Sequence, residues 1–348
     1  MLSVQTGVFA IKKNGSSVAL SVFASLHNVE VVDEINVPSM FSFSMNMNTQ
    51  YGSSSEANLD YFQPGDLINI SLGIDQLHPM ITGQVTAIEP SFSSSALNVT
   101  IRGFDCMYKL DFGTRTKTYE NQGDAQIVQD VAQASRVSIS VEGNPGKVNG
   151  YVIQNNVSNF RFLLSRGEQL NYELLTRGSS LLFRPSAEGN SPVKTLEFPR
   201  DIDDINLNLK LPTMGAEVTA IGYDVLTNKV ITAIAAKATP SDKMGGSETG
   251  YQAADDFPIS KVQLECPNIS DPRALQEVAD AKYQALLKTF IEGTVSVIGD
   301  AQLVAGVNIK LQGLSTKFNG TYYVISSTHT YDESAGYKTT IKVRRTGI

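Results

Sequence analysis

Residues 41–47 are Phe-Ser-Phe-Ser-Met-Asn-Met, with an apolar side chain at every second position. A period of two places the apolar side chains on one face of a β-strand, where they pack on a core while the other face meets solvent. The same alternation recurs in residues 18–25, 68–74 and 97–102. Turn sequences such as Pro64-Gly65-Asp66 separate these runs. The pattern predicts half-buried antiparallel strands that form a small barrel or sandwich over residues 1–105.

The chain from Cys106 onward mixes helical and strand patterns. Asp124 is a candidate cap for a helix whose apolar stripe includes Ile127 and Val131. A second helix is expected to begin at Ser158. A hairpin is expected after it, with residues 172–175 and 181–183 joined across Arg177-Gly178. Residues 106–210 are therefore predicted to form a middle α/β domain.

Strand patterns return in residues 211–348, and the last three strands are expected at 304–311, 321–331 and 337–345. Residues 239–256 are rich in Gly, Ser, Asp and Thr, which predicts a long mobile loop. Asp271-Pro272 predicts the start of a long helix over 272–291, because Asp suits the cap and Pro the first turn. The expected fold is mainly β with an α/β insertion: two antiparallel β-barrel domains plus the middle α/β domain.

Charge and hydropathy exclude several classes of protein. The 28 Lys and Arg are outnumbered by 35 Asp and Glu spread along the chain, which disfavours nucleic-acid binding because phosphates require clustered cations. The densest basic run, Lys342, Arg344 and Arg345, is too short to form such a patch alone. No stretch approaches the roughly 20 consecutive apolar residues of a membrane helix. Residues 1–15 show no secretory signal, so synthesis in the cytoplasm is expected.

Catalytic and metal-binding motifs are missing from the sequence. It contains no HExxH helix, P-loop, GxSxG elbow or GxGxxG turn. Cys106 and Cys266 match no metal or redox spacing and are expected to be two buried thiols or, alternatively, a disulfide. His329 shares a strand face with Ser327 and Tyr331, which favours a packed or interface side chain. We therefore predict no catalytic, cofactor-binding or metal-binding residue and no enzymatic activity.

Two stretches of the sequence have glycines at similar places relative to the expected strands. Residues 64–103 and 305–344 each contain a Gly turn that leads into a strand, a second Gly at the start of another strand, and a closing alternating strand. Such an internal match predicts a duplicated barrel. A subunit with two similar barrels could build six equivalent positions from three copies.

Segments in the order of the chain resemble the late control D family of phage tail hubs. The same fold forms the first part of the VgrG-type spikes of type VI secretion and extracellular injection systems. Four segments are similar. The first runs from Gly65-Asp66 through Gly83 to Arg102-Gly103-Phe104-Asp105 and Leu110, and the second is residues 156–183 with Ser165-Arg166-Gly167-Glu168. The third is residues 218–224, which include Gly222-Tyr223-Asp224, and the last is the terminal block of residues 318–329 and 336–344. Spike members of the family continue into a small barrel and a needle, whereas this sequence stops at Ile348. Either the needle is a separate polypeptide or the sequence is a truncated part, so piercing is not assigned to it.

The resemblance implies a structural baseplate hub whose two tube-like barrels per subunit form a pseudo-sixfold ring in a homotrimer. Its implied partners are the hexameric ring of the inner tube protein, a trimeric spike or needle protein, and baseplate wedge proteins outside. The hub would be assembled in the cytoplasm and become part of a phage tail or injection particle. Lys342, Arg344 and Arg345 are candidates for the channel or the spike interface, unless they are simply solvated.

Two other classes of function compete with the hub. A tail-associated cell-wall hydrolase would need a general acid and a second carboxylate across a cleft, and the hub-like segments already occupy most of the chain. A monomeric adhesin would present aromatic platforms, yet the sequence has no Trp and its tyrosines are scattered.

Overall fold

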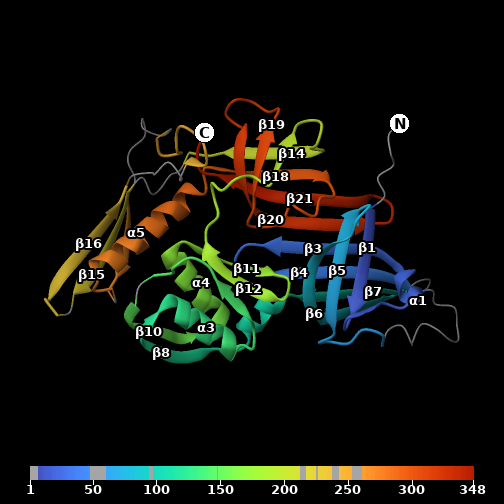
Figure 1. Cartoon of the computed structure of the whole chain (residues 1–348), viewed down its shortest axis with the longest axis horizontal. Helices are drawn as coiled ribbons and strands as arrows, with labels where there is room; N and C mark the ends of the chain where they lie inside the picture. The colour runs from blue at the N-terminus through green and yellow to red at the C-terminus, as the bar shows by residue number, and fades with distance from the viewer. Residues whose placement is uncertain are drawn as a thin grey trace.

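The computed structural model describes residues 7–47, 60–93, 97–146, 148–211, 217–224, 226–236, 243–252, 261–267 and 269–348. Within these residues the protein is mainly β, and a 13-stranded sheet runs through two barrels. A middle α/β domain lies against both barrels, and a small sheet with one long helix projects to the side (Figure 1). Four separate apolar clusters fill these four units.

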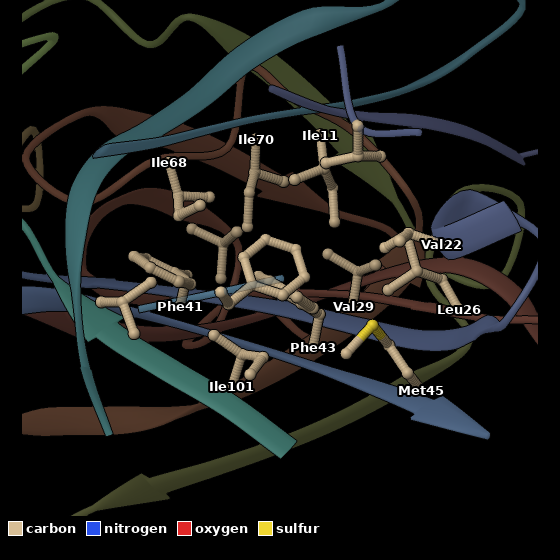
Figure 2. Close-up of a cluster of buried hydrophobic side chains, with 14 of the residues drawn as sticks. Ile11, Val22, Leu26, Val29, Phe41, Phe43, Met45, Ile68, Ile70 and Ile101 are labelled. Atoms are coloured by element: carbon tan, nitrogen blue, oxygen red, sulfur yellow. The ribbon is translucent and has the colours of Figure 1, made fainter. Parts of the chain in front are cut away.

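The first barrel is an antiparallel sheet in the order β3-β4-β7-β6-β5-β1-β2. Its core contains the predicted stripe Phe41, Phe43 and Met45, stacked with isoleucines of neighbouring strands (Figure 2). The strands are β1 (Gly7–Lys13), β2 (Ser16–Ser17), β3 (Leu26–Glu34), β4 (Val37–Met47), β5 (Leu67–Ile74), β6 (His78–Phe92) and β7 (Leu97–Phe104).

The strand predicted over residues 18–25 is wrong. This segment contains the short helix α1 (Leu20–Phe23) instead, and β2 ends before it at Ser17. Val18 and Val22 are both buried while Leu20 is largely exposed. Buried residues four positions apart lie on one face of a helix. The sequence did not reveal this helical spacing, because apolar residues at every second position also include every fourth one.

The middle domain contains the two predicted helices and the predicted hairpin, but one predicted cap is wrong. Ser158 caps α4 by accepting a hydrogen bond from the Arg161 amide at 3.2 Å. Asp124 is instead the first residue of α3, and its buried carboxylate accepts a hydrogen bond from Arg166 at 2.6 Å. The elements are a 3₁₀ helix η1 (Cys106–Asp111), β8 (Arg115–Gly123), α3 (Asp124–Ala134), β9 (Ile139–Val141), β10 (Val148–Val157), α4 (Asn159–Leu170), β11 (Tyr172–Arg177) and β12 (Ser180–Pro185).

The second barrel recruits strands from both sides of residue 211. β14 pairs with β18 and β13 pairs with β19, so residues 194–209 lie in this barrel and not in the middle domain to which the sequence patterns assigned them. The strands are β13 (Lys194–Glu197), β14 (Asp204–Leu209), β18 (Ile291–Ile298), β19 (Asn308–Gln312), β20 (Gly320–Asp332) and β21 (Gly336–Arg345).

A separate unit is inserted between β14 and β18. It comprises β15 (Glu217–Asp224), β16 (Lys229–Ala235), β17 (Lys261–Cys266) and α5 (Pro272–Leu287). Asp271 caps α5 as predicted, but the helix ends before residue 291 because Ile291 begins β18. Within the predicted loop 239–256, residues 243–252 include a β-bridge from Thr249 to Gly347. Residues 239–242 and 253–256 lie outside the described residues.

The two barrels have the same topology. Their strands follow the orders β3-β4-β7-β6-β5-β1 and β14-β18-β21-β20-β19-β13, and the chain visits corresponding strands in the same sequence. β6 and β20 even carry a bulge at the same place, after Val85 and Val324. One pairing differs: β1 runs antiparallel to β5, whereas β13 runs parallel to β19. The predicted duplication is therefore present in the fold.

Hydrogen bonds give the correspondence residue by residue. The Gly65 amide donates to the Val85 carbonyl, and in the second barrel the Gly306 amide donates to the Val324 carbonyl. The glycine pattern in the sequence aligned this first strand correctly. It misaligned the next strand by two residues, because it matched Gly83 to Gly320 while the structure matches Gly83 to Tyr322. Gly83 and Gly320 therefore do not occupy equivalent positions in the two barrels.

Candidate assembly interface

The three basic residues proposed for an interface have different environments on β21. Lys342 is exposed. Arg345 is only 4% exposed, and it donates to the carbonyl of Asn319 at 2.8 Å while its guanidinium lies over the ring of Tyr322. Arg344 is partly buried and turns toward the middle domain. Lys342 is thus the member of this set whose side chain faces solvent.

Arg344 belongs to a buried cluster of charges where the middle domain, the inserted helix and the second barrel meet. Its Nε donates to Glu188 at 2.5 Å, and its guanidinium lies 3.9 Å from Glu173. Lys288, just after α5, pairs with Glu188 at 3.4 Å. Arg184 lies 3.7 Å from Glu173. Three cations thus surround two carboxylates.

Hydrogen bonds from neutral groups complete this cluster. The hydroxyl of Tyr323 donates to Glu173 at 2.5 Å, and that of Ser186 donates to it at 2.9 Å. Burial lowers the pKa of Lys288 and raises that of Tyr323, although Glu188 works against the change at Lys288. Charges withdrawn from water need partners of this kind, since an uncompensated buried charge is strongly destabilising.

A second junction centres on Asp33 at the end of β3. Its carboxylate accepts hydrogen bonds from Ser39 at 3.1 Å, from the Ala305 amide at 3.1 Å and from Arg177 at 3.4 Å. These donors come from the first barrel, the second barrel and the middle domain. Burial raises the pKa of Asp33, and Arg177 opposes that rise. Nearby, Asn36 exchanges two hydrogen bonds with Leu174 of β11. The junction joins three units of the chain.

His329 is fully buried, in agreement with the expected packed side chain. Its Nε2 lies 3.1 Å from the carbonyl of Leu303 and 2.6 Å from the hydroxyl of Ser327, while its Nδ1 lies 2.8 Å from the hydroxyl of Tyr337. Because a carbonyl only accepts, this arrangement fits a neutral ring that carries its proton on Nε2. Burial lowers the pKa of His329 to about 4. The Ser327 hydroxyl is buried as well, so the pair is closed to a polymeric substrate.

Two clefts flank the junctions. A cleft of about 580 Å³ lies between the barrels, where Lys194 pairs with Asp300 and Arg200 pairs with Asp201 at 2.8 Å. A cleft of about 550 Å³ between α4, α5 and the second barrel exposes one side of the Glu173–Arg344 cluster. In the first cleft these two ion pairs lie within the chain, and in the second Arg344 and Lys288 pair with Glu188.

The described residues offer no metal site and no membrane-spanning helix. These residues include no group of three or more His, Cys, Asp or Glu side chains placed to hold a metal ion. Among the helices described, none has the length and apolar content needed to cross a membrane. Cys106 and Cys266 are free thiols, which agrees with one of the two expected alternatives, but both are partly buried and not fully buried as that alternative expected. Burial raises the pKa of Cys106 to about 12, which keeps it in the unreactive thiol form.

The fold is that of phage tail proteins. A 43 kDa tail protein of prophage MuSo2 from Shewanella oneidensis superposes with a TM-score of 0.73 at 12% identity, over 98% of both chains. A tail protein from Neisseria meningitidis MC58 gives 0.73 at 10% identity, over 98% of this chain and 97% of its own. An E. coli component of the type VI secretion system gives 0.60 at 11% identity, over 96% of this chain and 76% of its own.

The family model described as the Alg8 N-terminal domain matches residues 3–333, and the chain belongs to this family. No curated protein matches the sequence.

Removal of the Glu173 carboxylate should destabilise the protein strongly. Glu173→Ala leaves Arg184 and Arg344 less compensated and Tyr323 without its acceptor, so we expect a loss of about 3–5 kcal/mol. Glu89→Ala removes the partner of Arg102 in an ion pair that is about half exposed, and its effect should stay within about 1 kcal/mol. Urea unfolding of both variants tests this, and equal effects would contradict a structural role for the cluster.

The protein should become less stable as the pH decreases, because the unfolded chain binds a proton at His329 more readily than the folded chain does. The pKa of His329 is about 4 in the fold against 6.5 in the ordinary state, so the unfolded chain takes up a proton first as pH drops. Stability from this group is complete above pH 6.5 and is lost progressively down to about pH 4, by up to about 3 kcal/mol. His329→Gln cannot titrate. The gap in unfolding midpoint between wild type and this variant should therefore narrow from pH 7 to pH 4.5, and a constant gap would refute the assignment.

Proposed function

We propose that the protein is the structural baseplate hub of a contractile tail or injection system. The observation that carries this proposal is the duplicated barrel with identical strand order in both copies. The likeness in fold to tail proteins over nearly the whole chain supports it. So does the likeness to a component of the type VI secretion system.

The duplication supplies a physical route between two symmetries. Three copies of a chain with two equivalent barrels present six similar positions around one axis. Such a ring matches a hexameric ring of inner tube protein on one side and a trimeric spike or needle protein on the other. The hub therefore acts as a homotrimeric symmetry adaptor of the late control D or VgrG-like type.

The remaining units give each subunit its asymmetric surface. The middle domain and the inserted unit of β15–β17 and α5 lie beside the barrels (Figure 1). They are the proposed contact surface for baseplate wedge proteins. Lys342 is the exposed candidate for the channel or the spike interface. Arg344 and Arg345 make hydrogen bonds inside the chain instead and hold β21, which carries Lys342, in place.

The hub acts by assembly and not by catalysis. Its partners are other proteins of the particle, with no specificity for nucleic acid. It is assembled in the cytoplasm and becomes part of a virion or an extracellular particle.

Native mass and negative-stain images of the purified chain test the hub. We expect a trimer of about 113 kDa from chains of 37.7 kDa, seen as a ring with a central hole. Addition of the spike and tube proteins of the same particle should give complexes with one spike trimer per ring. A chain that stays monomeric with both partners would overturn the symmetry-adaptor function.

A further inference from the structure

Several described strands have an edge that pairs with no other described strand, and β14 and the second half of β6 are two of them in the large sheet. β14 pairs with β18 on one side only. β6 pairs with β5 as far as Gln84, and beyond Val85 its described strand partner is β7 alone. Exposed edges of this length are sites where another strand adds to a sheet.

The chain contains a template for what fills such edges. β20 of the second barrel corresponds to β6. Beyond Val324, the edge of β20 that matches the unpaired edge of β6 pairs antiparallel with β3. β3 corresponds to β14, because β3 pairs with β4 in the first barrel and β14 pairs with β18, the counterpart of β4, in the second. The pairing of β3 with β20 thus joins the first barrel to the second. Its counterpart would join β14 of one copy to β6 of the next.

The shared hydrogen-bond pattern sets the register of that counterpart. The equal bulges match Phe92 to Tyr331 and Ser91 to Thr330. The pairings of β3 and β14 with their neighbours match Val29 to Ile205 and Glu30 to Asn206. Within the chain, Tyr331 lies opposite Val29 and Thr330 opposite Glu30. Between copies, Phe92 would lie opposite Ile205, and Ser91 opposite Asn206.

Side-chain burial differs between the two kinds of edge in the way this pairing requires. Val29 and Val31 of β3 are 0% and 1% exposed under β20, whereas their counterparts Ile205 and Leu207 of β14 are only partly buried. Tyr331 reaches from the second barrel and packs against the core of the first. Its counterpart Phe92 is 70% exposed. A neighbouring β14 would give this aromatic ring the environment that Tyr331 already has.

Pro90 modifies the pairing at one position. The Ile35 amide donates to the Ile325 carbonyl, so alternate residues of β20 from Ile325 on, including His329, turn their backbone groups to β3. Pro90 is the counterpart of His329 and has no N–H, although its carbonyl can still accept. One ladder bond is therefore absent, which suits an edge strand that must stay unpaired until the correct partner arrives.

We propose that β14 of one copy pairs antiparallel with residues 88–92 of β6 in the next copy and so continues the sheet from chain to chain. The two strands lie far apart in the molecule. β14 is the end strand of the sheet order, near the top of the view, and β6 lies below β4 (Figure 1). The contact is head-to-tail and closes a ring when the rotation per copy allows. The number of three copies rests on the proposed hub function.

Disulfide cross-linking tests the register. Ser91 and Asn206 are exposed on the outer face, and as a non-hydrogen-bonded pair their Cα atoms would be about 4.5 Å apart. In a background with Cys106 and Cys266 replaced by Ser, the pair Ser91→Cys and Asn206→Cys should give linked dimers and closed trimers. The offset pair Ser91→Cys and Asn208→Cys should link poorly, since diagonal neighbours are about 7–8 Å apart. Native mass is measured on the same samples.

Each outcome separates the two proposals. Trimers without the Ser91–Asn206 link, or with stronger linking in the offset pair, would overturn the strand pairing and leave the hub intact. A monomeric wild type would overturn both. Trimers that link at the predicted pair would support both.

A charge at the exposed aromatic ring gives an independent test. Phe92→Asp should shift the trimer to monomer without lowering the thermal midpoint of the isolated chain, because Phe92 is 70% exposed. Leu226→Asp is the matched control, since Leu226 is 97% exposed at the β15–β16 turn and far from the edge. Trimers that survive Phe92→Asp as well as they survive Leu226→Asp would contradict the pairing.

Discussion

The antiparallel pairing of β3 with β20 is the contact on which the rest of the molecule depends. It turns two barrels into one continuous sheet, it buries His329 and Ser327, and it packs the partly buried Tyr331 against the first core. At its end, Asp33 collects donors from three units of the chain. A strand pairing is directional and fixes register, so the barrels are held at one relative position and do not move as beads on a linker. A ring built from such units needs that rigidity.

The duplicated barrels differ mainly in what lies between two of their strands. β3 and β4 are joined by a turn at Ile35 and Asn36, which docks on β11. β14 and β18 are separated by the whole inserted unit of β15–β17 and α5. The buried cluster of Glu173, Glu188 and Arg344 with its neighbours holds this unit against the middle domain and the second barrel. In the proposed trimer, equivalent barrels would offer similar faces to a sixfold partner while their attachments would repeat only three times.

The candidate site could be predicted from the sequence only in part. The run Lys342, Arg344 and Arg345 stands out locally, but the partners of Arg344 are at positions 173 and 188, far away in the sequence. Nothing in a local pattern shows that Arg345 turns inward onto carbonyls near residue 319. The free edges of β6 and β14 were equally hidden, because an edge is defined by the strands that do not reach it. The packed position of His329 was expected from its place in an alternating strand, and the free thiols of Cys106 and Cys266 were one of two expected alternatives.

The sequence by itself determined the local elements and the duplication. Alternation in residues 41–47 and 97–102, the cap at Ser158 and Asp271-Pro272 each act over a few residues, so their signals survive without any tertiary context. Only the tertiary structure decided which strands pair, in which register, and where a barrel ends. Residues 194–209 joined the second barrel through partners about 100 residues away, and the second repeated strand lay two residues from its glycine alignment. Pairing depends on contacts between distant segments, and since side chains alternate faces, a slip of one residue would turn a buried face to solvent.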